Sequence, residues 1–234
     1  MTRITNQAFD KGMVKQLYIG IVTEGPTDVR FLKSVIERTF EDIAFNECVQ
    51  DIDIQTFVIK TSKIGLDFCE HIKQASFDGV SSYGIMTLVV HTDADKDTYE
   101  ERKNNKIAPA REFLENLDEN YCKLLTPVIP VRMTEAWMLA DKELLKKHIG
   151  TTKNDNILGI DRAPETISDP KAAIENAIRI AMDDLPKRRH RITISELYEI
   201  MGDAIGLDKL MTLSSYGKFT DEVRATYRAL GYMY

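Results

Sequence analysis

The chain has 234 residues, of which 43% are hydrophobic, and a formal net charge of −6. This is the composition of a globular protein with one full core and room for a small appendage. No apolar run approaches the roughly 18 residues of a membrane span, and the polar start lacks the apolar core of a secretory signal, so we expect a cytoplasmic protein without a membrane partner. The acidic balance argues against a protein that coats nucleic acid by charge alone, although it does not exclude a nuclease, because bound metal ions invert the effect of carboxylates on a phosphate. Three widely spaced cysteines fit reduced thiols better than a disulfide frame or a zinc site.

The first half of the chain alternates strand and helix patterns. Near-continuous apolar runs at 17–22 and 84–90 predict strands covered by helices on both faces of a parallel sheet. The apolar stripe over 28–45 predicts a helix. Residues 52–59 alternate apolar and polar side chains at first, which predicts a strand nearer the sheet edge, and a second helix is predicted over 65–75.

The next segment predicts a loop, a helix and a short strand. Residues 96–106 are almost wholly polar and predict a solvated loop, and a helical stripe follows over 107–121. A fourth strand over 124–131 contains Pro127 and Pro130, which have no backbone N–H and therefore place it at an edge or shorten it.

From residue 134 onward the pattern is helical. A helix is predicted over 135–149, and residues 151–168, rich in Asn, Asp, Gly and Thr, predict a linker or lid. Capping and terminating residues mark the helix ends: Gly150, Asp169 with Pro170, Thr193 with Glu196, and Gly231. We therefore expect an α/β domain over 1–150, with a mostly parallel sheet of about four strands flanked by helices, and a helical C-terminal extension over 151–234 that packs on it.

Acidic segments follow two of the predicted strands. Thr23-Glu24-Gly25-Pro26-Thr27-Asp28 comes after the first apolar run, and His91-Thr92-Asp93-Ala94-Asp95-Lys96-Asp97 after the later one. Ligands of open α/β sheets gather outside the carboxyl ends of the strands, so these carboxylates can converge. Clustered negative charges repel unless a cation neutralises them, and hard oxygen ligands suit Mg²⁺ or Mn²⁺. The sequence therefore predicts a divalent-metal site at one edge of the sheet.

The order of these motifs resembles a known family. Glu-Gly-x-x-Asp after a first strand and Asp-x-Asp after a later strand are similar to the TOPRIM domain of topoisomerases, bacterial primases and the OLD (overcoming lysogenisation defect) nucleases. The segment Glu135-Ala136-Trp137-Met138-Leu139-Ala140-Asp141 is similar to one found in small stand-alone TOPRIM-like bacterial proteins related to the OLD nuclease domain. The resemblance covers about the first 150 residues and implies a TOPRIM, Rossmann-like fold.

The resemblance and the local geometry together give a candidate ligand set. The resemblance makes Glu24 the first choice of ligand, assigns Asp28 to a second ion and adds Glu135. Asp28 at a helix start has the equal alternative of a plain helix cap. Asp93 and Asp95 are two apart in an extended segment, so we expect their side chains to share a face and bind one ion jointly, the alternative being a charged turn. The predicted metal ligands are Glu24, Asp28, Asp93, Asp95 and Glu135, with Glu24, Asp93 and Asp95 also catalytic.

Cations for the scissile phosphate are harder to assign. The resemblance implies a catalytic lysine from the C-terminal part, and we take Lys187 as that residue, with Lys171 and Lys218 as further candidates. The basic run predicts nucleic-acid contacts by Lys187, Arg188, Arg189 and Arg191. Such a run is more often a solvated surface, so it ranks below the carboxylates. Trp137 is expected to pack in the core rather than stack on a base.

The function expected from this reading is a Mg²⁺- or Mn²⁺-dependent endonuclease that hydrolyses DNA or RNA by a two-metal mechanism. The chain has neither a Walker loop nor a GxGxxG fingerprint, so the ABC-type ATPase that the resemblance implies as a partner in anti-phage defence must be a separate chain. The alternative is a non-catalytic TOPRIM subunit that binds nucleic acid or an ATPase; templated primer synthesis is a weaker third. Homo-oligomerisation stays open.

Overall fold

A computed structural model describes residues 14–183 and 192–234. The strands are β1 (Lys15–Val22), β2 (Ile52–Val58), β3 (Thr87–His91) and β4 (Leu125–Val128). The helices up to residue 149 are α1 (Asp28–Glu47), α2 (Phe68–Tyr83), α3 (Tyr99–Arg102), the π-helix η1 (Lys103–Ile107), α4 (Ala108–Glu115), α5 (Thr134–Met138) and α6 (Lys142–Ile149). They are followed by α7 (Asp155–Leu158), the 3₁₀-helix η2 (Pro164–Thr166), α8 (Pro170–Met182), α9 (Ile194–Ala204), α10 (Leu207–Leu210) and α11 (Ser214–Ala229). None of the helices in the described ranges is long and apolar enough to cross a membrane.

The four strands form one all-parallel sheet in the order β2-β1-β3-β4, which confirms the expected α/β, Rossmann-like class. β2 lies at one edge, as its alternating pattern predicted, and β4 lies at the other with only four residues. Pro127 lies opposite Val90 in this edge strand. A residue without a backbone N–H is tolerated there, because an edge strand has a partner on one side only.

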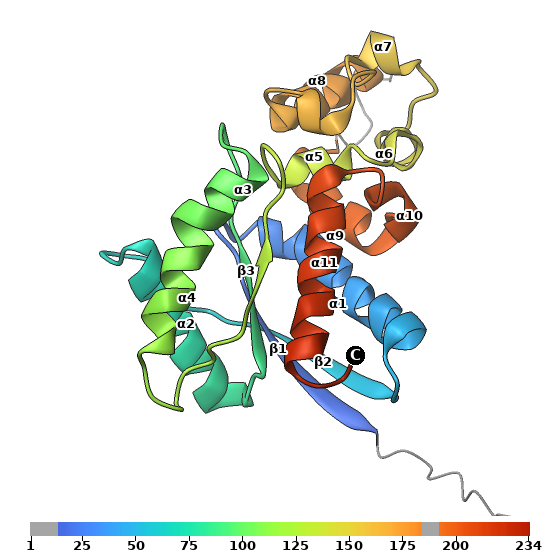
Figure 1. Ribbon diagram of the computed structural model, residues 1–234. Coiled ribbons are helices and arrows are strands. Elements are labelled where there is room, and N and C mark those ends of the chain that lie inside the picture. Colours follow the sequence, from blue (N-terminus) through green and yellow to red (C-terminus); the bar gives the residue numbers. More distant parts are fainter. Residues whose placement is uncertain (1–13, 184–191) are drawn as a thin grey trace, which may run out of the picture.

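Helices cover both faces of the sheet (Figure 1). α2, α3 and α4 lie on one face, and α1, α9 and α11 on the other. The chain moves from β1 outward to β2 and then back past β1 to β3, so right-handed crossovers place α1 and α2 on opposite faces. One hydrophobic core on the α1 side includes Leu17, Leu158 and Tyr227. The core is therefore continuous across residue 150, and the C-terminal helix α11 is part of the cover of the sheet.

The segment 96–106 is not the loop that its polarity predicted. It forms α3 and η1, and the helix begins at a capping box in which Thr98 and Glu101 bond to each other's backbone N–H. Tyr99 and Ile107 are buried there. The polar residues face solvent while these two anchor the segment, so average polarity was the wrong indicator.

The boundaries of other predicted elements differ as well; the helix predicted over 107–121, for example, ends at Glu115. The helix predicted over 65–75 begins later, after a capping box of Asp67 and Glu70, and continues to Tyr83. The helix predicted over 135–149 is interrupted, because the Asp141 carboxylate accepts a hydrogen bond from the N–H of Leu144 at 2.9 Å and starts a second helix.

The segment 151–168 is likewise not a loose linker. It contains α7 and η2, and both Leu158 and Ile160 are fully buried in the core. A few apolar residues in this polar segment are sufficient to pack it into the same core as α8. The predicted Asp169 cap of α8 is confirmed.

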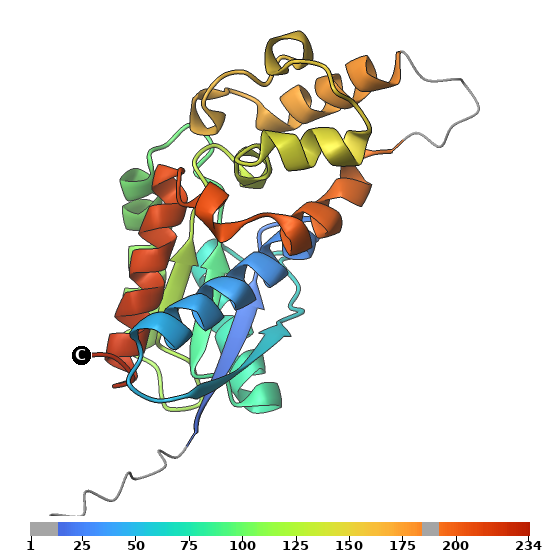
Figure 2. The same ribbon diagram turned by 90° about the vertical axis from the view of Figure 1, so that its right-hand side faces the viewer.

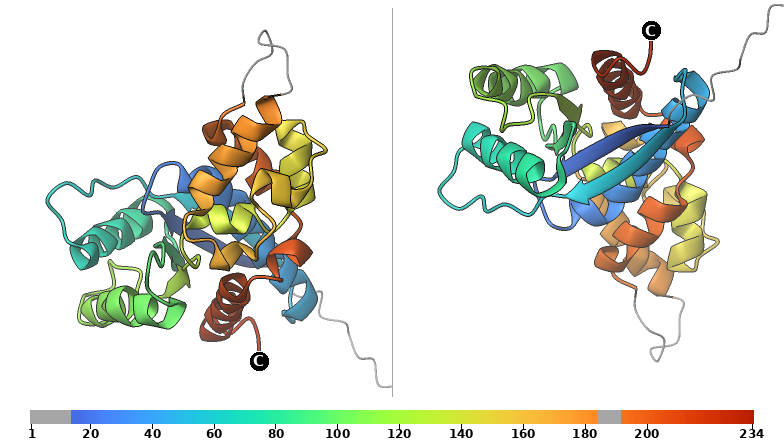
Figure 3. Two further views of the ribbon diagram at one scale, coloured as in Figure 1. Left: turned by 90° about the horizontal axis from the view of Figure 1, so that it is seen from above. Right: turned by 90° about the horizontal axis from the view of Figure 1, so that it is seen from below.

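Helices α5 to α8 lie beyond the carboxyl ends of the strands (Figures 1 and 2). Seen from above, α6 and α8 lie over the α1 side, while the loop between β2 and α2 extends away on the other side (Figure 3). α9 fits closely on α1, because a Cβ at Gly202 would come within 2.5 Å of the carbonyl oxygen of Phe31. This packing brings the C-terminal helices to the edge that carries the acidic segments.

Candidate functional site

The ends of β1 and β3 form the centre of the site. Val22 lies opposite Val90 in the parallel register, so Glu24 and Thr92 emerge at the same level. The Glu24 carboxylate accepts hydrogen bonds from the Thr92 hydroxyl at 3.1 Å and from the Asp93 N–H at 3.3 Å through the same oxygen, Oε2. After these adjacent strands the chain continues to helices on opposite faces of the sheet (Figure 1). Open α/β sheets bind ligands at such a point.

Asp28 is turned toward this point by the tight connection between β1 and α1. Its Oδ2 accepts a hydrogen bond from the N–H of Gly25 at 2.9 Å, ahead of the helix. Thr27 occupies the N-cap position without a side-chain cap bond, and the bond of Asp28 goes to the turn before the helix rather than to an N–H inside it. A Cβ at Gly25 would lie 2.8 Å from the Asp28 carboxylate, so the glycine permits this close approach.

His91, at the end of β3, lies among these carboxylates with its side chain fully buried. Its Nε2 is 3.2 Å from Asp93 Oδ1, and its Nδ1 is 3.9 Å from Asp28 Oδ2. The backbone N–H of Glu24 donates a hydrogen bond to Nδ1, with 3.4 Å between the two nitrogens. Burial alone would lower the pKa of His91, but the hydrogen bond to Asp93 and the charges of Asp28 and Glu24 outweigh it and raise the pKa. When it is protonated, the imidazole offsets part of the charge of the acidic cluster.

The start of α5 closes the other side of the cluster. The N–H of Thr134 donates to Asp93 Oδ1 at 3.0 Å. Glu135 is only 5% exposed, and its Oε1 accepts a hydrogen bond from the hydroxyl of Tyr198 on α9. A residue of the helical C-terminal part thus holds a predicted ligand, a contact that no motif in the sequence indicated.

The carboxyl groups of Asp28 and Glu135 both have a raised pKa. Burial is the main cause that raises the pKa of Asp28; His91 lowers it in part, and the charge of Asp93 raises it further. Burial likewise raises the pKa of Glu135, against the hydrogen bond from Tyr198, and Asp93 and Asp28 add to the rise. Both carboxyl groups resist ionisation, which a bound cation would reverse.

Asp95 does not join this cluster, contrary to the expectation that it shares a face with Asp93. Its φ of 54° breaks the extended geometry on which that expectation rested. The side chain is 60% exposed and its Oδ2 accepts a hydrogen bond from Arg102 at 2.6 Å, whereas Asp93 is 22% exposed and faces His91. Arg102 also lies 3.6 Å from the carboxylate of Asp97. The second half of the acidic motif is therefore compensated by an arginine of α3.

The donor set has the chemistry that a hard divalent cation requires. Glu24, Asp28 and Asp93 supply carboxylate oxygens from two strand ends and a helix start, and within the described ranges Oε1 of Glu24 and Oδ2 of Asp93 have no hydrogen-bond partner. In the same ranges, however, no three His, Cys, Asp or Glu side chains already stand as a metal-ligand group. The chemistry fits Mg²⁺ or Mn²⁺, whereas the closed coordination shell is not preformed.

Of the predicted cations, the structure describes Lys171 and Lys218. Lys187, Arg188, Arg189 and Arg191 lie outside the described residues. Lys218 is engaged with Glu100 and lies over the ring of Tyr99. Trp137 is fully buried and its indole N–H donates to Ser215 at 2.7 Å, so the packing role is confirmed.

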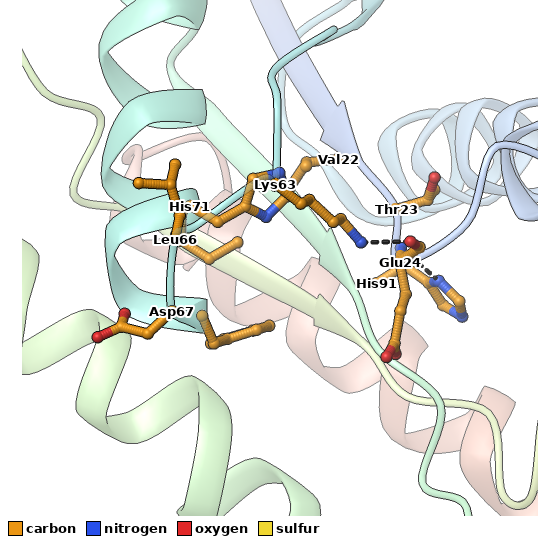
Figure 4. A pocket seen from close by; sticks show the side chains of 10 residues that line it. Val22, Thr23, Glu24, Lys63, Leu66, Asp67, His71 and His91 are labelled. Atoms are coloured by element: carbon orange, nitrogen blue, oxygen red, sulfur yellow. Dashed lines mark hydrogen bonds between the residues drawn. The ribbon is translucent and has the colours of Figure 1, made fainter.

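Lys63 is a cation at this site that the sequence analysis overlooked. It lies in the loop after β2, and its ammonium group donates to the backbone carbonyl of Glu24 (Figure 4). Partial burial lowers the pKa of Lys63, with Glu24 and Asp28 opposing the shift. The signal was present, because a third parallel strand also ends at this edge and is followed by Lys60-Thr61-Ser62-Lys63.

Comparisons with known proteins give a family and no activity. Residues 23–211 match the family model described as a domain of unknown function, DUF4276. No curated protein and no solved structure matches the chain. The matched range contains every carboxylate of the cluster.

Proposed function

We propose that this chain, which belongs to the DUF4276 family, is a divalent-metal-dependent nuclease whose acidic cluster hydrolyses phosphodiester bonds of DNA or RNA. One observation carries the proposal: the carboxylate of Glu24 reaches the backbone N–H of Asp93, 69 positions away in the chain, at the switch point of a parallel sheet. The resemblance of the same two motifs to the TOPRIM domain of OLD-type nucleases supports it. The proposed ligands are Glu24, Asp28 and Asp93, with Glu135 as the buried neighbour.

The protein's own residues orient the proposed site. Thr92 and the N–H of Asp93 fix one oxygen of Glu24, and Thr134 fixes one oxygen of Asp93, so each carboxylate presents its other oxygen in a restricted direction. His91, buried between Asp28 and Asp93, offsets part of their repulsion when it is protonated. Mg²⁺ or Mn²⁺, when bound, would supply a Lewis acid that activates water and stabilises the leaving oxygen, and the use of two such ions is a prediction.

The proposed biological setting is an anti-phage defence module. It rests on the resemblance alone, which implies an ABC-type ATPase on a separate chain as partner. Activity is therefore to be measured with and without the product of any neighbouring ATPase gene.

A non-catalytic binding subunit is the second candidate, and two observations favour it. The carboxylates do not form a ready metal-ligand group within the described residues, and they raise the pKa of the buried His91, whose protonation would offset part of their charge. Such a protein would bind nucleic acid or an ATPase without cleaving.

The test is a cleavage panel of plasmid, single-stranded DNA and RNA in Mg²⁺, Mn²⁺ or Ca²⁺. We expect cleavage in the first two ions and much less in Ca²⁺, whose looser coordination aligns the reacting groups less well. Glu24→Gln should abolish cleavage, with a melting temperature unchanged or slightly raised because one repelling charge is removed. Glu112→Gln is the matched control, since Glu112 is exposed on α4 away from the site.

Two outcomes separate the candidates. Cleavage by Glu24→Gln at the parent rate would reject the proposed site. Absence of cleavage by the parent protein under every condition, combined with measurable binding of nucleic acid or the ATPase, would favour the binding subunit.

A further inference from the structure

Two adjoining cavities lie beside Glu24, on the side away from helices α6 to α8 (Figure 3). The larger, about 640 Å³, lies between the carboxyl ends of β1 and β2 and the start of α1, and the smaller, about 190 Å³, lies against the start of α2. They share five lining residues, which are Val22, Thr23, Glu24, Lys63 and His71. We call this composite cavity the Lys63 groove. Its larger part falls within the roughly 300–1,000 Å³ of typical small-molecule sites.

The walls of the Lys63 groove combine an apolar surface with a cationic rim. Val29, Val58 and Ile59 line the larger cavity, and Lys60 and Lys63 border it. A flat ring could pack on the aliphatic wall while an anionic group meets the lysines. A ligand that carries both a heterocycle and a phosphate matches this division of the walls.

His71 gives the groove a polar group whose ring nitrogens can bond to a ligand. The residue is 5% exposed, lines both cavities, and makes no side-chain hydrogen bond to another described residue. Burial, and then the charge of Lys63, lower its pKa, so the ring is neutral and offers one donor and one acceptor. A ligand with ring nitrogens or hydroxyls could form hydrogen bonds with both ring nitrogens.

Lys63 lies between the groove and the acidic cluster. Its side chain extends from the loop to the backbone oxygen of Glu24, beside His71 (Figure 4). The Glu24 carboxylate points instead to Thr92 and Asp93. An anion in the groove can therefore contact the ammonium group next to the backbone of Glu24.

We propose that the Lys63 groove binds one unpaired nucleotide unit, with the base against Val29, Val58 and Ile59, a polar edge at His71, and the phosphate at Lys60 and Lys63. The placement of this unit next to the scissile bond rests on the proposed nuclease function. Binding of the nucleotide unit itself does not depend on the nuclease function. The nucleotide is either free or part of a single strand, because a paired base presents no separate face to a cavity of this kind.

The experiment is titration calorimetry with AMP, adenosine, ribose 5-phosphate and a short single-stranded oligonucleotide, first in EDTA and then in Mg²⁺. AMP or the oligonucleotide should bind in EDTA more tightly than either fragment. Lys63→Gln should weaken this binding about tenfold, as for a lost charge-assisted hydrogen bond, and leave adenosine binding unchanged. Lys209→Gln, an exposed lysine on α10, is the matched control and should bind as the parent does.

His71→Gln provides a second test with its fold checked by circular dichroism. It should weaken adenosine and AMP equally, because it acts on the base and not on the phosphate. Tighter binding of the oligonucleotide than of AMP would identify a strand as the source, and the reverse would identify a free nucleotide.

Binding that Lys63→Gln leaves unchanged, or no binding of AMP and oligonucleotide, would overturn the proposal. These results are independent of cleavage. Nucleotide binding that depends on Lys63, without any cleavage, would support the groove proposal and contradict the nuclease proposal. Cleavage that Lys63→Gln leaves unaltered, together with absent nucleotide binding, would support the nuclease proposal and contradict the groove proposal.

Discussion

Asp93 and Asp95 differ by two positions in the chain and lie in different environments. Asp93 is 22% exposed and is held by His91 and Thr134, whereas Asp95 is 60% exposed and paired with Arg102. The first carboxylate belongs to a crowded cluster that a cation would relieve, and the second already has its counter-charge. The difference shows that an acidic motif is not a ligand set until each carboxylate has been assigned its compensating charge.

Removing each carboxylate gives the largest contrast. Asp93→Ala should lower the proposed cleavage rate about a thousandfold, ~4 kcal/mol in the barrier, and strongly weaken Mg²⁺ or Mn²⁺ binding in titration calorimetry. Asp95→Ala, the matched control, should change either quantity less than tenfold because its partner is Arg102. Equal losses in the two variants would break the comparison and return Asp95 to the ligand set.

Removing the buried imidazole tests whether it compensates the cluster. His91→Leu should lower the free energy of unfolding by about 3 kcal/mol in metal-free buffer, because the buried side of Asp93 loses its hydrogen-bond partner and the cluster loses the group whose protonation can offset its charge. Mg²⁺ should restore part of this loss in urea denaturation. His71→Leu removes another buried histidine, one that forms no ion pair with the carboxylates among the described residues, and should show no such rescue by Mg²⁺. Rescue of both variants, or of neither, would remove His91 as the compensating group.

The link from the C-terminal helices to the cluster is expected to be weaker. Tyr198→Phe should destabilise the fold by about 1–2 kcal/mol, because the buried carboxyl group of Glu135 loses its hydrogen-bond donor. A double-mutant cycle with Glu135→Gln in urea denaturation measures the coupling. Additive effects would mean that the contact does not stabilise the site.

An exposed ion pair gives the smallest effect and calibrates the others. Glu47 on α1 accepts hydrogen bonds from Arg224 on α11, and chiefly for this reason the pKa of Glu47 lies below the ordinary 4.5. Glu47→Gln should lower the free energy of unfolding by only about 0.5 kcal/mol. The contribution should be complete above pH 4.5, the unfolded value, and disappear as the pH falls through the lower folded value. The stability difference between parent and variant, measured from pH 7 to pH 3, should shrink accordingly. A difference that grows on acidification would contradict the pairing.

Local patterns predicted more of the fold than of the site. The apolar runs before residues 23 and 91 specified buried parallel strands, and the two prolines specified a short edge strand. Segments whose folding depends on a few buried residues were missed, as with the polar stretch 96–106, which is anchored by Tyr99 and by the adjoining Ile107. Polarity averaged over such a stretch hides the positions that anchor it.

What the sequence alone determined is that Glu24 and Asp93 each follow a buried strand, because apolar runs and the acidic residues after them are local features. Which carboxylates meet was decided by the parallel register, which sets Glu24 level with Thr92, and by a positive φ that turns Asp95 toward Arg102. Only the tertiary structure brought Lys63 and Tyr198 to the same edge, from the loop after β2 and from α9. Their positions depend on strand order and on the close fit of α9 to α1, which are properties of packing between distant segments and leave no local pattern in the chain.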